Sequence, residues 1–284
     1  MTRQWRGFLL LLAACLAAAA CSVSRIAYLN APPLALWYVG GYFDMSDPQK
    51  AFFKERLSRA MAWHRQNELP EYRRAIETLI AKSQAKVEVD DVRAIYGLAR
   101  NYYYRAVEHL LPDLADFVVQ LDERQLGQAE RKFADDNRKL VRESVKGTPE
   151  ERREKLVKKY VDQFEDWTGK LSAPQREIIA EAVKGMADNT EDRLGDRRYR
   201  QVEALALARA KPPRDKLIAQ LRRLLIETET WRRPEYAKKM RERDERMFVA
   251  VSELTSTLTP AQRAHLQDKM RGYVKDISAI LASR

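Results

Sequence analysis

A five-residue pattern occurs four times in this chain, and each copy predicts where a helix begins. It consists of an apolar residue, then Ser, Thr or Asp, then two variable positions and Gln. The second residue can accept a bond from the backbone N–H three positions later, while the Gln side chain reaches back to that residue's own N–H. Losing such a capping box costs on the order of 1 kcal/mol. The capping pairs are Ser46 and Gln49, Asp122 and Gln125, Ser172 and Gln175, and Thr259 and Gln262.

The stretches between these caps predict helices and no strands. Glycine is scarce, with 10 residues, and 33% of the residues are charged, which is typical of an all-helical protein. Turns of two to five residues separate the helices, so neighbours should pack antiparallel. We therefore predict an all-α protein, an antiparallel multi-helix bundle of about eight or nine helices. Their expected ranges are 47–66, 69–84, 90–120 with a kink or end at Pro112, 122–145, 149–169, 173–209, 213–230, 234–256 and 260–282.

The spacing of the caps raises the question of an internal repeat. Gln49 precedes Gln175 by a distance similar to that by which Gln125 precedes Gln262. Two pseudo-repeated halves of four helices would explain this spacing. Chance would also explain it in a helical chain rich in Gln and Arg. Thr148 begins a fifth capping box, with Glu151 in place of Gln, so capping alone also accounts for the pattern.

The N-terminus has the composition of an export signal. Two arginines precede an apolar stretch, 7–20, which ends in alanines and is followed by Cys21. This arrangement resembles bacterial lipoprotein signals, in which the cysteine after the cleavage site is acylated. Cys15 also follows a suitable triplet, but cleavage there would leave an apolar region of only about seven residues. We expect lipidation at Cys21, with Ser22 favouring the outer membrane over the inner one.

These features divide the chain into three parts. Residues 1–20 are the expected signal peptide, 21–44 a lipidated tether with an aromatic segment, and 45–284 the helical domain. The aromatic segment either packs on the helical body, which we expect, or lies at the lipid interface, where Trp and Tyr are favoured. A transmembrane anchor needs about 20 apolar residues, and the N-terminal stretch is shorter. We expect a protein attached by its lipid and facing the periplasm.

The charge of the chain bears on its partners. The formal net charge is +11, and in a cytosolic protein this excess would indicate nucleic-acid binding. Export argues against nucleic acid as a partner. The basic residues either face anionic headgroups or an acidic partner, or form a solvated helical surface, since Asp and Glu are interspersed with them. We expect the membrane, through the lipid, and other envelope proteins as partners.

No motif in the sequence predicts catalysis. The three histidines lie far apart, no His-Glu-x-x-His motif occurs, and no phosphate-binding or nucleophile motif is present. We therefore predict no enzyme, no catalytic residue, no metal site and no cofactor. The acidic residues between 188 and 196 are expected to pair with arginines. Four residues are candidates for binding, although each also suits a core or boundary position: Trp63, His64, Tyr102 and Tyr103.

Two resemblances complete the prediction. The pentad 258–262, Leu-Thr-Pro-Ala-Gln, resembles the LTxxQ motif of the Spy/CpxP family of periplasmic stress proteins. This implies a helical protein, and for some members a chaperone that uses a concave, basic and apolar surface. A second resemblance rests on Cys21-Ser22, Tyr28-Leu-Asn30, Trp37, Tyr42-Phe43-Asp44 and Trp63-His64-Arg65. These residues are similar in order to a family of uncharacterised proteobacterial lipoproteins, a domain of unknown function.

The functional prediction follows from these points together. We expect a lipid-anchored, non-enzymatic protein facing the periplasm that binds envelope proteins or unfolded clients in a chaperone-like manner. The alternative is a structural lipoprotein that holds an envelope complex at the membrane.

Overall fold

The computed structural model describes residues 23–283, and within this range the chain forms helices and no strands. The all-α prediction is confirmed. In chain order the elements are α2 (Val23–Leu29), α3 (Ala31–Phe43), α4 (Asp47–Trp63), the π-helix η1 (His64–Glu68), α5 (Leu69–Lys82), α6 (Val89–Val118), α7 (Glu123–Leu140), the π-helix η2 (Val141–Val145), α8 (Pro149–Thr168), α9 (Ala173–Lys184), α10 (Thr190–Ala210), α11 (Arg214–Leu225), the 3-10 helix η3 (Thr228–Thr230), α12 (Pro234–Ser256) and α13 (Pro260–Ala282).

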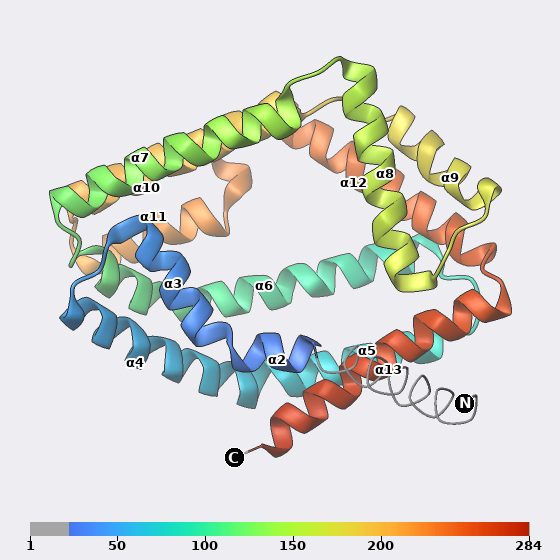
Figure 1. Ribbon diagram of the computed structural model, residues 1–284, viewed down its shortest axis with the longest axis horizontal. Coiled ribbons are helices and arrows are strands. Elements are labelled where there is room, and N and C mark those ends of the chain that lie inside the picture. Colours follow the sequence, from blue (N-terminus) through green and yellow to red (C-terminus); the bar gives the residue numbers. More distant parts are fainter. Residues whose placement is uncertain (1–22, 284) are drawn as a thin grey trace, which may run out of the picture.

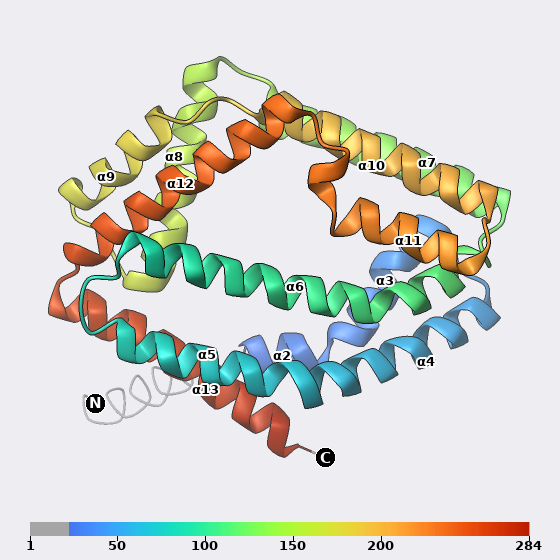
Figure 2. The same ribbon diagram turned by 180° about the vertical axis from the view of Figure 1, so that it is seen from behind.

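The helices are arranged around a flattened ring and do not form a bundle about one core (Figure 1). One long side contains α4, α5, α6 and α13, and the other contains α7 and α10; α8, α9 and α12 close one end. Seen from behind, α11 lies along α6 (Figure 2). Buried apolar residues accordingly fall into separate clusters. Each of these clusters joins only a few neighbouring helices, so no single core lies at the centre of the ring.

The N-termini of four helices meet in two pairs, one pair at each end of the long axis of the ring (Figure 1). We call these places the first and the second junction. At the first junction, α3 leads into α4, α6 leads into α7, and α3 packs on α7 while α4 packs on α6. At the second, α8 leads into α9, α12 leads into α13, α8 packs on α13 and α9 packs on α12. The predicted capping residues lie at these two junctions.

The first junction is held by two glutamines, 76 residues apart, that bond to each other. Gln49 Nε2 donates to Gln125 Oε1 at 3.1 Å, and Gln125 Nε2 donates to Gln49 Oε1 at 2.7 Å. Each Oε1 also accepts the N–H of its own cap, from Ser46 at 2.9 Å and Asp122 at 3.2 Å. Each Nε2 also donates to the carbonyl that precedes the partner's pentad, Gln120 at 2.9 Å for Gln49 and Asp44 at 3.3 Å for Gln125.

The second junction repeats this set of bonds. Gln175 and Gln262 exchange Nε2–H···Oε1 bonds of 2.8 and 2.9 Å, 87 residues apart in sequence. Their Oε1 atoms accept the cap N–H groups of Ser172 at 2.9 Å and Thr259 at 3.0 Å. Their second Nε2–H groups donate to carbonyls that again precede the partner's pentad, Thr257 at 3.0 Å and Lys170 at 2.9 Å.

The pattern explains why these boxes contain Gln. A carboxylate can accept the N–H of the cap, but only an amide can also donate, and each pair needs both functions. The fifth box fits this distinction, because Glu151 accepts the N–H of Thr148 at 3.0 Å at an exposed site. The apolar first residue of each pentad is buried beneath its junction: Met45, Leu121, Leu171 and Leu258.

Several helix boundaries differ from the prediction, and the described helices outnumber the expected eight or nine. The segment before residue 44 is helical, because Pro32 and Pro33 lie in the first turn of α3, where a missing N–H is tolerated. The range predicted as 173–209 is divided at Gly185, where α9 ends before α10 begins. Conversely, α6 continues through Pro112. Before Pro70 the chain forms the π-helix η1 and does not stop, so α4, η1 and α5 follow one another without a break.

One side of the aromatic segment packs on the body, whereas Trp37 and Tyr38 on the other side are exposed. Tyr42 is buried, and its hydroxyl donates to Asp136 at 2.5 Å. The ring of Phe43 meets that of Phe117 edge-on at 5.9 Å. None of the described helices combines the length and the apolar character needed to cross a membrane.

We predict that Gln125→Glu weakens the fold although the cap is kept. The carboxylate still accepts the N–H of Asp122, but it cannot donate to Gln49 or Asp44, and it places a charge at a site that is 1% exposed. The free energy of unfolding, measured with chemical denaturant, should fall by about 1–3 kcal/mol. The matched control is Glu151→Gln in the exposed box, for which we expect a change of no more than about 0.5 kcal/mol. Equal effects for the two variants would show that Gln125 acts only as a cap.

Candidate functional site

One face of α6 carries an arginine between two tyrosines. Tyr96, Arg100 and Tyr104 are spaced four residues apart, so they share one side of the helix. The guanidinium of Arg100 donates to the Tyr104 hydroxyl at 2.5 Å and lies 5.9 and 5.4 Å from the ring centres of Tyr96 and Tyr104. The hydrogen bond to Tyr104 raises the pKa of Arg100. Arg100 is therefore a fixed cation on an exposed aromatic surface.

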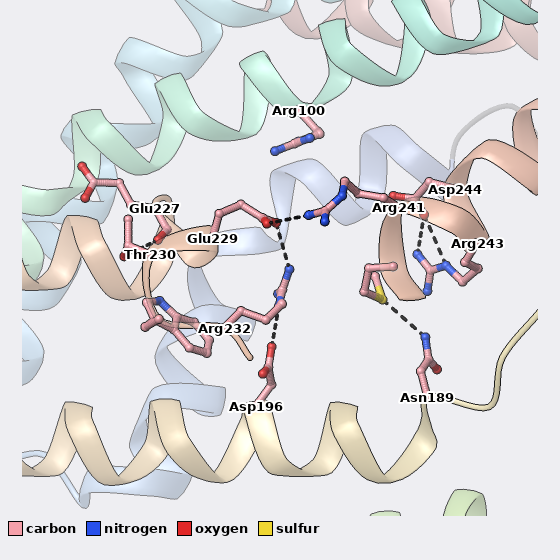
Figure 3. Close-up of polar contacts among 12 residues, drawn as sticks. Arg100, Asn189, Asp196, Glu227, Glu229, Thr230, Arg232, Arg241, Arg243 and Asp244 are labelled. Atoms are coloured by element: carbon pink, nitrogen blue, oxygen red, sulfur yellow. Dashed lines mark hydrogen bonds and ion pairs between the residues drawn. The ribbon is translucent and has the colours of Figure 1, made fainter. Parts of the chain in front are cut away.

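A chain of charged side chains lies opposite this face (Figure 3). The carboxylate of Asp196 on α10 accepts from Arg232 at 2.7 Å. Glu229 then lies between Arg232 at 3.5 Å and Arg241 of α12 at 3.2 Å. In Figure 3 the side chain of Arg100 points toward Glu229 and Arg241 from α6. Side chains from α6, α10, the η3 segment and α12 therefore converge inside the ring.

Asp244 connects α12 to α6 beside this chain. It accepts from the Tyr96 hydroxyl at 3.0 Å and from Arg243 at 2.8 Å. Burial, and then the charge of Asp244, raise the pKa of Tyr96, so this phenol remains protonated and acts as a donor. A surface ion pair, Arg93 with Glu245 at 2.6 Å, joins the same two helices. The Tyr96–Asp244 hydrogen bond and the Arg93–Glu245 ion pair thus both connect α6 to α12.

A basic pocket of about 270 Å³ adjoins this surface and shares Arg243 with it. Its walls come from η2, α8, the α9–α10 turn and the start of α10. The carboxylates that line it are those of Glu143 and Asp188. Asp188 accepts from Arg152 at 2.6 Å; burial opposes ionisation, but bonds from Thr190 and Arg152 hold its pKa below the usual range. The basic lining residues are Arg152, Arg153, Lys155, Lys159, Arg193 and Arg243.

Four of these cations are exposed and make no ion pair within residues 23–283. They are Arg153, Lys155, Lys159 and Arg193. By contrast, Arg152 and Arg243 are held by Asp188 and Asp244. The pocket therefore presents free positive charge, which can bind anionic groups, next to tyrosines that can stack or donate hydrogen bonds.

The carboxylates of the surface are engaged by arginines, which leaves them poorly suited to act as bases. Asp196 and Asp244 each accept from a guanidinium. In the described part of the chain, no three His, Cys, Asp or Glu residues are arranged to hold a metal ion. The chemistry that this arrangement offers is binding of charged groups and of aromatic side chains.

Three of the four predicted binding residues lie elsewhere, on the helices that carry an ion pair with a buried carboxylate. Glu68 is buried and accepts two bonds from Arg105, at 3.0 and 2.7 Å. Tyr102 lies against Tyr72, with ring centres 4.7 Å apart, and His64 contacts Tyr72 from another side. Trp63 stacks on His109 at 3.8 Å.

The position of His64 fits a boundary residue. It is half-buried and lies 3.3 Å from the Tyr28 hydroxyl. Tyr103 points away from this group; it is 51% exposed, and its hydroxyl donates to the Leu225 carbonyl at 3.3 Å. The capping residues lie at the junctions and not in the inner surface. Cys21 lies outside the described residues.

The charged inner surface was not predicted from the sequence. The expected ion pairing of the acidic cluster is found, but its partners are distant in sequence: Arg152 for Asp188, Arg233 for Asp192 and Arg232 for Asp196. The four-residue spacing of Tyr96, Arg100 and Tyr104 was a usable signal for an aromatic and basic stripe. No local sequence signal indicated the basic pocket, because its residues come from three separate parts of the chain.

The comparisons with known proteins identify a family. Residues 41–237, more than half of the chain, match a family described as a family of unknown function (DUF6279). The match includes the first junction, α8 to α11 and the start of α12. No curated protein matches the chain, and no solved structure does.

We predict that His64 makes stability depend on pH. Burial lowers its pKa below the ordinary 6.5, with Glu68 opposing this shift. The unfolded chain therefore binds a proton more readily than the folded one, so stability should be retained above about pH 6.5 and fall below it. In His64→Gln, the free energy of unfolding should decrease less than in the wild type between about pH 7.5 and about pH 5.5. Parallel pH profiles for the two proteins would contradict this assignment.

Proposed function

The chain belongs to DUF6279, a family of unknown function, and we propose that it is a lipid-anchored protein of the bacterial envelope that binds other polypeptides and catalyses no reaction. In this proposal Cys21 carries the acyl groups, and the ring faces the periplasm, with the outer membrane as the favoured location. The clients are envelope proteins or unfolded chains, bound in a chaperone-like manner.

The observation that carries the proposal is the group of four free cations at the basic pocket. Arg153, Lys155 and Lys159 follow one another along α8, and Arg193 faces them from α10. Free positive charge of this kind favours an acidic partner and accelerates encounter with it. The exposed tyrosine and arginine surface of α6 extends the contact with groups that suit peptide recognition.

The size and chemistry of the pocket favour a polypeptide over a small substrate. Its volume of about 270 Å³ lies just below the range of about 300–1,000 Å³ typical of ligand pockets. The nearby carboxylates Asp188, Asp196 and Asp244 are held by arginines. The surface thus offers charge and stacking over an extended area but no activated acid, base or nucleophile. The resemblance to LTxxQ proteins supports the same role.

A structural scaffold is the second candidate. The closed ring and its two hydrogen-bonded junctions favour a body of fixed shape, which suits one partner better than many. Crosslinking in intact membranes separates the two proposals. A broad set of client proteins supports the chaperone-like role, whereas one stoichiometric partner supports the scaffold.

The proposal predicts that reversing the free charges weakens client binding. We expect the double variant Arg153→Glu, Lys159→Glu to bind an acidic unfolded client about tenfold less tightly, since each reversed surface contact contributes about 0.5–1 kcal/mol. It should also suppress client aggregation less well at equal concentration. Light scattering and fluorescence anisotropy would measure the two effects.

The matched control reverses two other exposed lysines that form no ion pair with any residue the structure describes, Lys54 on α4 and Lys216 on α11. It has the same net charge as the test variant, but both positions lie outside the pocket lining. Equal losses in the two double variants would mean that only total charge matters. If the wild type fails to suppress aggregation at stoichiometric excess, the chaperone-like role is excluded.

A further inference from the structure

The helices α2 and α3 have one face on the protein and one face in solvent. On the protein side, α2 packs on α13, and α3 packs on α4 and α7. The outward face carries large apolar side chains that are 52–76% exposed: Ile26, Leu29, Leu34, Trp37 and Tyr38. Among the large apolar side chains of the described chain, that of Trp37 is the most exposed. We call this set the outer apolar face.

The composition of this segment is unusual for a helix in water. Residues 26–43 contain no Asp, Glu, Lys or Arg, although 33% of the chain is charged. A surface helix of a soluble protein normally has charged residues on its solvent side, and a helix that is apolar all round is normally buried. Several large apolar side chains exposed on two consecutive helices indicate a partner.

The place of the outer apolar face in the chain indicates what covers it. α2 begins at Val23, two residues after Cys21, and an extended chain advances only about 3.3–3.6 Å per residue. An acyl group on Cys21 would therefore hold the first turn of α2 at the bilayer surface. Trp and Tyr, which dominate the exposed side of α3, are the residues enriched at the level of lipid headgroups.

We propose that the outer apolar face lies in the interfacial region of the lipid bilayer and fixes the orientation of the ring on the membrane. This inference rests on the proposed lipid anchor for its choice of partner, but not on the proposed binding of clients. Interfacial helices bury their apolar side about 5–10 Å into the headgroup boundary. Here the protein body takes the place of the usual charged side, because the other face of α3 is packed through Tyr42 and Phe43.

Tryptophan quenching by brominated lipids tests this inference. The protein, purified with its native modification, is reconstituted into vesicles of phosphatidylcholine and phosphatidylglycerol, with or without bromine on the acyl chains near the headgroup. Bromolipids should quench part of the tryptophan emission. In Trp37→Phe the quenched part should be lost, whereas Trp167→Phe, a variant at another exposed tryptophan, should retain it. Circular dichroism of both variants confirms that the fold is kept.

Two results would overturn the inference. The first is Trp37 emission that bromolipids leave unchanged in vesicle-bound protein. The second is Trp37 emission already shifted to the blue without lipid, in a species of twice the monomer mass by sedimentation, since a second copy would then cover the face. Mass spectrometry of Cys21 tests the anchor separately. If the cysteine is unmodified, quenching of Trp37 after addition of the protein to vesicles still supports the proposal that the outer apolar face lies in the bilayer interface. Absence of this quenching overturns the proposal.

Discussion

The reciprocal glutamine pair is the interaction on which this ring depends. At each junction two amides bond to each other, to both helix caps and to two loop carbonyls, so six polar groups are satisfied together. Gln125 and Gln175 are almost fully buried. An unsatisfied buried polar group costs about 1–3 kcal/mol, so losing one amide affects the other groups as well. The pairs therefore set which helix starts meet, and with them the course of the chain around the ring.

The charged inner surface follows from this arrangement. Arg100 and Arg241 lie on helices whose directions are set at the junctions, since α6 ends at the first and α12 ends at the second. Exposed ion pairs contribute little stability themselves, about 0–1 kcal/mol. They do not hold the ring together, and we infer that the ring instead holds them in position. The separate hydrophobic clusters leave such polar surface accessible, which a bundle with one core would have filled.

Sequence reasoning succeeded where the signal is local and failed where it is not. The capping boxes at Ser46 and Thr259 were predicted correctly, because a cap involves only four residues. The bond from Gln49 to Gln125 joins residues 76 apart, and nothing in a single sequence indicates such a partner. For the same reason the ring and the basic pocket were not predicted. The break at Gly185 had a local signal in its glycine and the following Asp and Asn, although one continuous helix was predicted there.

Residue-resolved amide hydrogen exchange tests the central claim most directly. Loops that precede helices normally exchange fast, but the N–H groups of Ser46, Asp122, Ser172 and Thr259 donate to the paired glutamines. The account predicts that these four exchange as slowly as the helices they begin. Thr148, whose N–H donates to the exposed Glu151, is the internal reference and should exchange much faster. Exchange of all five at one fast rate would contradict the claim that the glutamine pairs hold the ring.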